Sequence, residues 1–250
     1  MPLRIQRQAH IQTLMRDNSL LSLLDEGVSA KLAADMEAVH LDRGDILVDV
    51  GETVKYAYFP CNGTMVSYLV VLPNGSTVET GLIGREGAVS GVVSHGSLPA
   101  FARCEAQTPG PSLRISVADL DKARAVWPQL DKLLVRYSDC LMAQVFQSVA
   151  CNASHTIEQR AAKWLIAVAE RTGSSDIGLE QEQFASMLGV GRSYVTRVLS
   201  RLRKAGLLSN RRRMICISDM KGLRRTACAC NDITRDHFIS VLGAYPTGPD

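Results

Sequence analysis

The chain has 250 residues, 46% of them hydrophobic and 21% charged, which is ordinary for a globular protein of one or two domains. No apolar run is long enough to span a membrane, no secretory signal is present, and the seven cysteines form no C-x-x-C pair, so we expect a cytoplasmic protein with reduced thiols. The net charge of +3 is uneven: residues 155–225 hold 14 Lys or Arg against 6 Asp or Glu, a surplus that indicates a polyanionic partner.

The region from Asp45 to Ile115 has the pattern of short strands separated by glycines. Residues 64–72 alternate as a strand that is apolar on both faces, and residues 77–83 follow as a second strand. Asn74-Gly75 between them is a strong hairpin signal. The sequence therefore predicts an α+β protein that begins with a β-roll or jelly-roll effector domain over residues 18–120.

A long helix with a heptad pattern is predicted over residues 128–153, within a segment at 121–153 that joins two unlike regions. Its apolar stripe must be buried either on its own domain or on a second copy of the chain. We expect the second copy, because the stripe is narrow, and we expect a hinge at residues 151–154. The dimer contact is expected at Leu130, Leu134, Tyr137, Leu141 and Val145.

Residues 154–225 are predicted to form a third unit, which begins with a helix from Thr156 and ends in two helices over 181–205. Ala185, Gly189 and Val195 have the spacing that two helices need when they cross closely at a tight turn. This pattern predicts a helix-turn-helix, followed by a wing whose tip carries three arginines. Residues 226–250 are expected to be a C-terminal tail with a disordered end.

The exposed face of the second helix suits the major groove of DNA, because arginine pairs with guanine edges and hydroxyl groups reach bases or phosphates. Two other interpretations are weaker. Gly189-Val190-Gly191 lacks the third glycine of a dinucleotide fingerprint, and the helix lacks the Trp or Phe of a membrane-surface helix. The expected DNA-binding residues are Arg192, Ser193, Tyr194, Thr196, Arg197, Ser200, Arg201, Arg211, Arg212 and Arg213.

From about residue 18 to about residue 230, the sequence resembles the Crp–Fnr family of bacterial transcription regulators. The resemblance rests on Gly44-Asp45-Ile46 and Gly51-Glu52 in the β-roll, on the long helix, and on residues 189–199 of the winged helix. It implies a cyclic-nucleotide-binding-like domain, a homodimer on a near-palindromic duplex, and RNA polymerase as a partner of an activator. It also places Arg192, Ser193 and Arg197 at base-contacting positions.

The resemblance places an effector pocket at Gly84, Glu86 and Gly87, with Arg103 nearby on the following strand. Ala100 stands where a cyclic-nucleotide binder of the family carries a phosphate-binding arginine, and an anion buried without a cation is costly. Cyclic nucleotide is therefore disfavoured, and the effector stays unidentified. For Glu86 we favour a surface or loop-capping carboxylate.

The cysteines and histidines give no cofactor signal. An iron–sulfur cluster is not expected, because no cysteine precedes Cys61, and heme is not expected, because the five histidines show no ligand spacing. Cys228 and Cys230 are compatible with redox or metal chemistry, but two thiols do not complete a zinc site. We expect no metal site, and we expect small core residues at Cys61, Cys104, Cys140 and Cys151.

Three functions compete. The favoured one is a sequence-specific regulator that binds DNA as a homodimer under the control of its effector domain. An enzyme is disfavoured, because residues 45–115 contain no nucleophile motif, carboxylate pair or metal-ligand cluster. The third is a cyclic-nucleotide-responsive module that acts through a protein partner.

Overall fold

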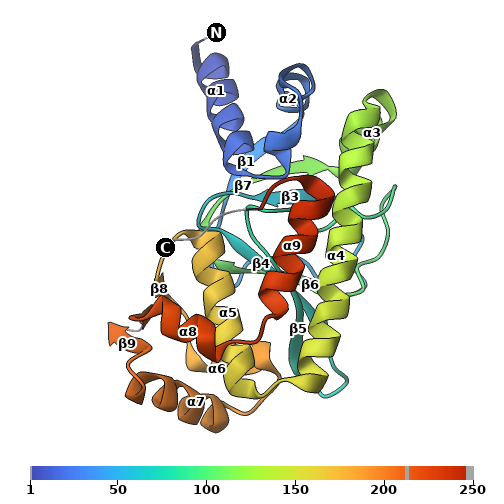
Figure 1. Cartoon of the computed structure of the whole chain (residues 1–250). Coiled ribbons are helices and arrows are strands. Elements are labelled where there is room, and N and C mark those ends of the chain that lie inside the picture. Colours follow the sequence, from blue (N-terminus) through green and yellow to red (C-terminus); the bar gives the residue numbers. More distant parts are fainter. Residues whose placement is uncertain (1, 212–213, 246–250) are drawn as a thin grey trace.

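A computed structural model describes residues 2–211 and 214–245, and it consists of a β-rich part and a helical part joined by a long helix (Figure 1). The predicted α+β class is confirmed. Two antiparallel sheets form the β-rich part. The first has the strand order β1 (Glu37–Leu41), β7 (Gly110–Ser116), β3 (Tyr56–Pro60), and the second the order β2 (Ile46–Val48), β6 (Arg103–Thr108), β4 (Met65–Val71), β5 (Thr77–Ile83).

The two sheets enclose an apolar core of their own, to which β1, β3, β4, β5 and β6 all contribute buried side chains. The β4–β5 hairpin turns at Asn74-Gly75, as the sequence predicts, and Gly75 has the positive φ of 81° that such a turn requires. Strand β4 is buried on both faces because β4 is an inner strand of the second sheet and helices pack on that sheet's outer side.

Helices cover the outer face of the first sheet. They are α1 (Pro2–Asp17), a 3-10 turn (Leu21–Leu23), α2 (Glu26–Leu32) and α3 (Val117–Val126). Ile11, Leu14 and Met15 of α1 are buried in this core. The first domain therefore begins before residue 18, the boundary expected from the sequence, because α1 is an integral part of its core.

The long helix is α4 (Pro128–Ser154), which begins with proline at its first turn. It continues through residues 151–154, where the sequence suggested a hinge, and the break falls at His155. Thr156 then starts α5 (Ile157–Thr172) with a capping box formed with Gln159. The change of direction is therefore one residue later than expected.

The helical part contains a helix-turn-helix and a small sheet. Its elements after α5 are β8 (Asp176–Ile177), α6 (Gln181–Leu188), α7 (Arg192–Lys204), β9 (Leu208–Arg211), β10 (Met214–Ile217) and α8 (Met220–Thr226). Its core also includes Met65 and Leu82 of the β-roll, so the two parts are packed together. Within the described ranges, no helix has the length and hydropathy that crossing a membrane requires.

Part of the expected C-terminal tail at residues 226–250 is helical, which corrects that expectation. Residues Cys230–Leu242 form a further helix, α9, which lies beside α4 (Figure 1). Phe238 of α9 is fully buried in the core of the first domain, and Tyr245 packs against the same core. Residues 246–250 of the expected disordered end lie outside the described residues.

Candidate nucleic-acid interface

The turn between α6 and α7 depends on three positions. Gly189 ends α6 in the left-handed conformation with φ of 66°, which glycine adopts without strain. Ala185 is 4% exposed, and its carbonyl accepts a hydrogen bond from the Val190 N–H at 3.0 Å. Val195 is fully buried. These are the roles that the spacing predicted, so the helix-turn-helix is confirmed.

Helix α7 has one buried and one exposed face. Its buried side chains recur at helical spacing and hold it against α5 and α6. Ser200 is half-buried at the boundary of the two faces. The other side chains expected to bind DNA from this helix are exposed, namely Arg192, Ser193, Tyr194, Thr196, Arg197 and Arg201.

Neighbouring side chains orient this exposed face. The Arg197 guanidinium lies 5.2 Å from the centre of the Tyr194 ring, a cation–π contact that restricts the arginine. Arg192 lies 3.8 Å from the exposed carboxylate of Glu182 on α6, and the exposed Arg201 lies 3.2 Å from the half-buried carboxylate of Glu158 on α5. Exposed ion pairs of this kind are weak, so a phosphate or a guanine edge can replace the carboxylate.

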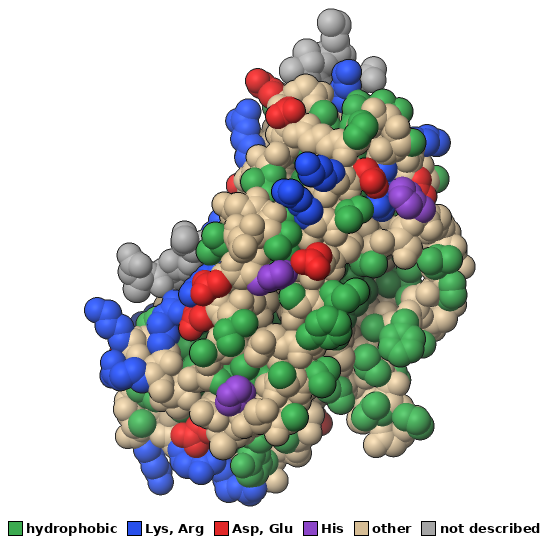
Figure 2. All heavy atoms as spheres, turned by 45° about the vertical axis from the view of Figure 1, so that its right-hand side comes forward, with side chains coloured by type: hydrophobic (Ala, Val, Ile, Leu, Met, Phe, Trp, Pro, Cys, Tyr) green, Lys and Arg blue, Asp and Glu red, His purple; other side chains and the backbone are tan. Residues whose placement is uncertain are grey.

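The predicted wing is the β9–β10 hairpin, in which Arg211 pairs with Met214 and is exposed. Arg212 and Arg213, the other two expected tip residues, lie outside the described residues. Strand β8 pairs with β10 and completes a three-stranded sheet beside α7. Figure 2 shows Lys and Arg side chains gathered at the end of the molecule that carries α7 and the hairpin.

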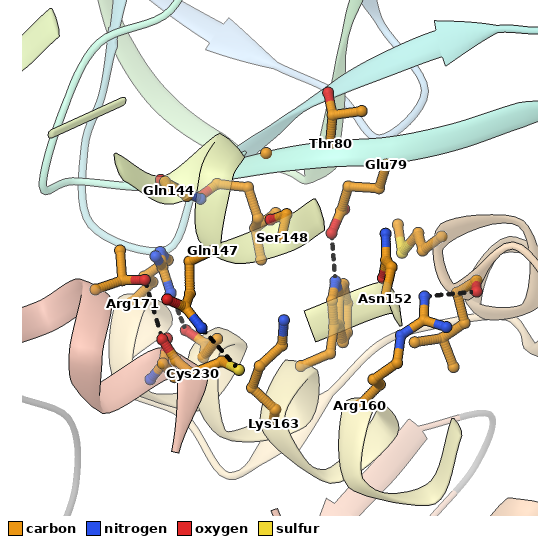
Figure 3. Close-up of a pocket in the computed structure, with 18 residues that line it drawn as sticks. Glu79, Thr80, Gln144, Gln147, Ser148, Asn152, Arg160, Lys163, Arg171 and Cys230 are labelled. Carbon is orange, nitrogen blue, oxygen red and sulfur yellow. Dashed lines mark hydrogen bonds between the residues drawn. The ribbon is translucent and has the colours of Figure 1, made fainter. Parts of the chain in front are cut away.

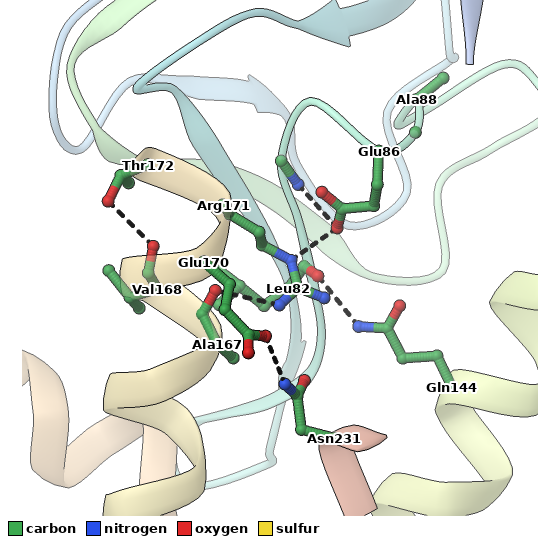
Figure 4. A network of polar contacts seen from close by, with 12 residues as sticks. Leu82, Glu86, Ala88, Gln144, Ala167, Val168, Glu170, Arg171, Thr172 and Asn231 are labelled. Carbon is green, nitrogen blue, oxygen red and sulfur yellow. Dashed lines mark hydrogen bonds and ion pairs between the residues drawn. The ribbon is translucent and has the colours of Figure 1, made fainter. Parts of the chain in front are cut away.

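The carboxylate of Glu86 is not part of an open effector pocket. It is 2% exposed, its Oε1 accepts a hydrogen bond from the Gly84 N–H at 3.0 Å, and Arg171 Nε of α5 lies 2.6 Å from the same oxygen (Figure 4). Burial lowers the pKa of Arg171, but the charges of Glu86, Tyr245 and Glu170 outweigh burial and raise it overall. Glu86 does cap its loop, as favoured, but it lies in the interior and joins two domains.

The other residues of the expected pocket are also occupied. Tyr137 of α4 fills the space beside Gly87, where an added Cβ would collide with the phenol ring, and its hydroxyl donates to the Ala88 carbonyl at 2.7 Å. Arg103 begins β6 and pairs with Asp49 through two hydrogen bonds of 2.8 and 2.9 Å, which lower the pKa of Asp49. The structure therefore does not bring the four expected pocket residues around one cavity.

A polar pocket of about 80 Å³ lies instead between the two parts of the molecule, lined by α4, α5, α9 and β5 (Figure 3). Glu79 of β5 accepts a hydrogen bond there from Trp164 Nε1 of α5 at 2.9 Å. Arg160, Lys163 and Arg171 of α5 also line it. Sequence reasoning missed this pocket, because its residues are far apart in the chain and no spacing connects them.

Several polar contacts fasten the helix-turn-helix to the β-roll. Ser186 of α6 lies 2.8 Å from the hydroxyl of Thr77 of β5 and donates to its carbonyl at 3.1 Å. Arg43 donates to the Gly178 carbonyl. Together with the Glu86–Arg171 pair, these contacts hold α5 and α6 on the second sheet and leave α7 at the far side.

The dimer residues expected on α4 require a correction. The hydrophobic core of the first domain contains three of these side chains, fully buried, namely Leu130, Leu134 and Tyr137. Leu141 is partly buried against the same core, so these four side chains do not face a partner. Only Val145 of the expected set is exposed. The exposed apolar side chains of α4 lie on a different face, and they are Val135, Met142, Val145, Phe146 and Val149.

Comparisons with known proteins agree with this architecture. Residues 159–226 match the model of the Crp-like helix-turn-helix domain. A curated relative is the global nitrogen regulator of Synechococcus elongatus, 24% identical over 214 residues, which are 82% of this chain and 95% of that protein.

Two solved structures are also similar. FixK2 from Bradyrhizobium japonicum has a TM-score of 0.66 and 18% identity, over 78% of this chain and 98% of that one. A transcriptional regulator of the CRP family from Thermus thermophilus has a TM-score of 0.64 and 19% identity, over 76% of this chain and 96% of that one. The β-roll, long helix and winged domain thus form one shared fold.

Proposed function

We propose that this chain, a Crp/Fnr-type transcriptional regulator with a helix-turn-helix DNA-binding domain, binds a near-palindromic duplex as a homodimer. Helix α7 enters the major groove, where Arg192, Ser193 and Arg197 read base edges, and the wing contacts the adjacent phosphates. The single observation that carries the proposal is the exposed face of α7, whose side chains are hydrogen-bond donors and cations on a helix fixed from behind by a buried apolar face.

The exposed stripe of α4 supports a second copy of the chain as its partner. Val135, Met142 and Val149 recur at seven-residue intervals, with Val145 and Phe146 between the last two, which is the pattern of a coiled-coil seam. Figure 2 shows hydrophobic side chains on the face of the molecule that α4 lines. Pairing two chains through this stripe would supply two recognition helices to successive major grooves.

The interior of the β-roll supports a regulator that binds DNA without a cyclic nucleotide. Tyr137 packs against Gly87 of the expected pocket, and Arg171 pairs with the expected ribose-binding carboxylate of Glu86. The alternative function, a cyclic-nucleotide-responsive module that acts through a protein partner, needs an open pocket in that place. RNA polymerase is a partner of the proposed regulator where it activates, and the cytoplasm is its place of action.

The test is fluorescence anisotropy of the purified protein, without added ligand, on its own upstream DNA and on a scrambled duplex of equal length. We expect at least about a hundredfold preference for the upstream DNA, because specific complexes usually exceed nonspecific ones by more than that. Equal binding to both duplexes would contradict the proposal. If an added cyclic nucleotide then created a preference, the space beside Gly87 must open to admit the nucleotide. DNA binding without a nucleotide would then be refuted.

A matched control comes from the opposite end of the molecule. Arg7 is an exposed arginine on α1, which Figure 1 shows at the end farthest from α7. Arg7→Ala removes the same charge as Arg197→Ala but should leave the preference unchanged. A loss of preference in both variants would indicate that net charge, not base contact, controls binding.

A further inference from the structure

Three cysteines and one histidine converge where α4 ends. Cys151 lies in the last turn of α4, and His155 is the residue that follows the helix. Cys228 approaches from the short connection between α8 and α9, and Cys230 is the first residue of α9. The three sulfur atoms and one histidine nitrogen all lie within 4.8 Å of one another. Four metal-binding groups from two distant segments therefore meet around one point.

Two of the separations lie close to the edges of a metal-centred tetrahedron. Zinc binds sulfur at about 2.3 Å and histidine nitrogen at about 2.0 Å, so two ligand sulfurs should lie about 3.8 Å apart and a sulfur and a nitrogen about 3.5 Å apart. Cys151 Sγ lies 3.6 Å from Cys228 Sγ, and Cys230 Sγ lies 3.5 Å from His155 Nδ1. The other separations are at most 4.8 Å, so closing a four-coordinate site needs a contraction of at most about 1.0 Å between two sulfurs and about 1.3 Å between a sulfur and the nitrogen.

The surroundings suit a buried metal thiolate. The three cysteines are between 0% and 8% exposed, and His155 is half-buried. Gln147 Nε2 donates to Cys230 Sγ at 3.1 Å, and Lys163 Nζ donates to Cys151 Sγ at 3.5 Å. Such donors orient thiolate ligands, and the ammonium balances the single negative charge that three thiolates leave on a divalent ion.

A disulfide between Cys151 and Cys228 is the main competing interpretation. It would use two of the four groups and would give no role to the thiol of Cys230, to its contact with His155, or to the donors beside them. A polynuclear iron–sulfur cluster fits less well, because its irons and sulfides separate the ligand sulfurs farther than in this cluster. Four nitrogen and sulfur ligands without an open position are typical of a structural zinc site.

We propose that Cys151, His155, Cys228 and Cys230 bind one Zn²⁺ ion that fastens the start of α9 to the end of α4. This site was not expected from the sequence. Binding releases the thiol protons of the three cysteines to solvent as each sulfur bonds to the metal, and His155 binds through one ring nitrogen. The proposal concerns the chain's own architecture, so it does not depend on whether the protein binds a palindromic duplex.

The first test is metal analysis of the full chain, purified under reducing conditions and dialysed against a weak chelator. We expect about one zinc per chain in the wild type, and less than about a tenth of that in Cys151→Ala and Cys228→Ala. Cys140→Ala is the matched control, because Cys140 is also a buried cysteine of α4 but lies outside the cluster. It should keep the full zinc content.

Cobalt gives a readout that survives if the alanine variants fold poorly. Apoprotein reloaded with Co²⁺ should show the intense visible bands of tetrahedral cobalt with a thiolate charge-transfer band. His155→Cys should keep a metal and strengthen that band, because it adds a fourth thiolate. Gln147→Ala should weaken metal affinity by about tenfold or more.

Two results would overturn the zinc site. One is a wild-type chain that takes up neither zinc nor cobalt under reducing conditions. The other is equal zinc content in the wild type, Cys151→Ala and Cys228→Ala. Peptide mass spectrometry without reduction would then show whether Cys151 and Cys228 form a disulfide instead.

Discussion

Arg171 Nε lies 2.6 Å from Glu86 Oε1, and the two side chains are only 3% and 1% exposed. The pair joins α5 of the DNA-binding domain to the loop after β5 of the first domain (Figure 4). Removing one partner of a buried ion pair leaves an uncompensated charge in the interior. The relative placement of the two domains therefore depends on this contact.

We expect Arg171→Met to lower the free energy of unfolding by about 3–5 kcal/mol, because it leaves the Glu86 carboxylate buried without its cation. Urea unfolding followed by tryptophan fluorescence would measure this, since Trp164 lies at the domain boundary. The double variant Glu86→Gln, Arg171→Met should recover part of the loss. Arg225→Met is the control, because this arginine is 75% exposed and should change stability by less than about 0.5 kcal/mol. Equal losses of unfolding free energy in Arg171→Met and Arg225→Met would contradict the prediction.

Glu79 should make stability depend on pH in a direction opposite to that of most carboxylates. Removal from water raises its pKa, although hydrogen bonds from Ser67 and Trp164 oppose the rise. A carboxyl whose pKa is raised binds its proton more tightly in the folded chain than in the unfolded chain. Its contribution to folding stability is therefore present at low pH, and it is lost as the pH rises from the ordinary pKa through the raised pKa. Glu79→Gln should therefore gain stability relative to the wild type as pH rises above the ordinary pKa of a glutamate. The urea midpoint of Glu79→Gln minus that of the wild type should therefore increase as pH rises, and a decrease would refute the prediction.

Phe146 and Leu134 on α4 should give different phenotypes. Phe146 is 66% exposed and Leu134 is fully buried in the chain's own core. If the proposed dimer forms through this face, Phe146→Ala should shift it toward monomer in light scattering at micromolar concentration, with little change in the unfolding of each chain. Leu134→Ala should instead destabilise the fold by about 2–5 kcal/mol. An unchanged oligomeric state in Phe146→Ala would exclude this face as the dimer contact.

Arg197→Ala should cost about 1–3 kcal/mol on the cognate duplex and relax the base preference at one position of each half-site. Competition against a set of single-base variants of the duplex would measure both effects. The cation–π contact with Tyr194 holds this arginine outward, so Tyr194→Ala should show a smaller loss in the same direction. If Arg197→Ala weakens binding to random DNA as much as binding to the cognate duplex, Arg197 does not read a base.

The wing arginines should act through phosphates. Replacing Arg211, Arg212 and Arg213 with glutamine should weaken binding to all DNA sequences alike. It should also reduce the slope of log K against log salt concentration by about three, close to one unit for each lost phosphate contact. Anisotropy titrations at four or more salt concentrations would give the slope. If it stays the same, the hairpin tip does not contact the backbone of the duplex.

Local patterns in the sequence predicted local structure well. Asn74-Gly75 predicted the β4–β5 hairpin, and Ala185, Gly189 and Val195 predicted the helix-turn-helix, because each pattern reflects a constraint within about ten residues. The Crp–Fnr resemblance is confirmed, since residues 159–226, which contain its most specific motif, match the Crp-like helix-turn-helix domain.

Patterns that depend on a distant partner were harder to interpret. The heptad stripe of α4 showed that one face is apolar but could not show that Leu130 and Leu134 pack on their own domain. Glu86 and Arg171 are 85 residues apart, and no spacing signals such a pair. Helix α9 was missed because its fully buried anchor is the single aromatic side chain of Phe238, too little for a clear amphipathic pattern.

The return of α9 to the first domain has a consequence for the order in which the protein is made. Domains generally fold as units during synthesis, beginning with the N-terminal one. Here Phe238 completes a core whose other members begin at Ile11. A nascent chain that has emerged only as far as α8 therefore exposes an unfilled apolar site beside α4. The first domain, although it comes first in the sequence, reaches its final packing only after residue 238 has left the ribosome.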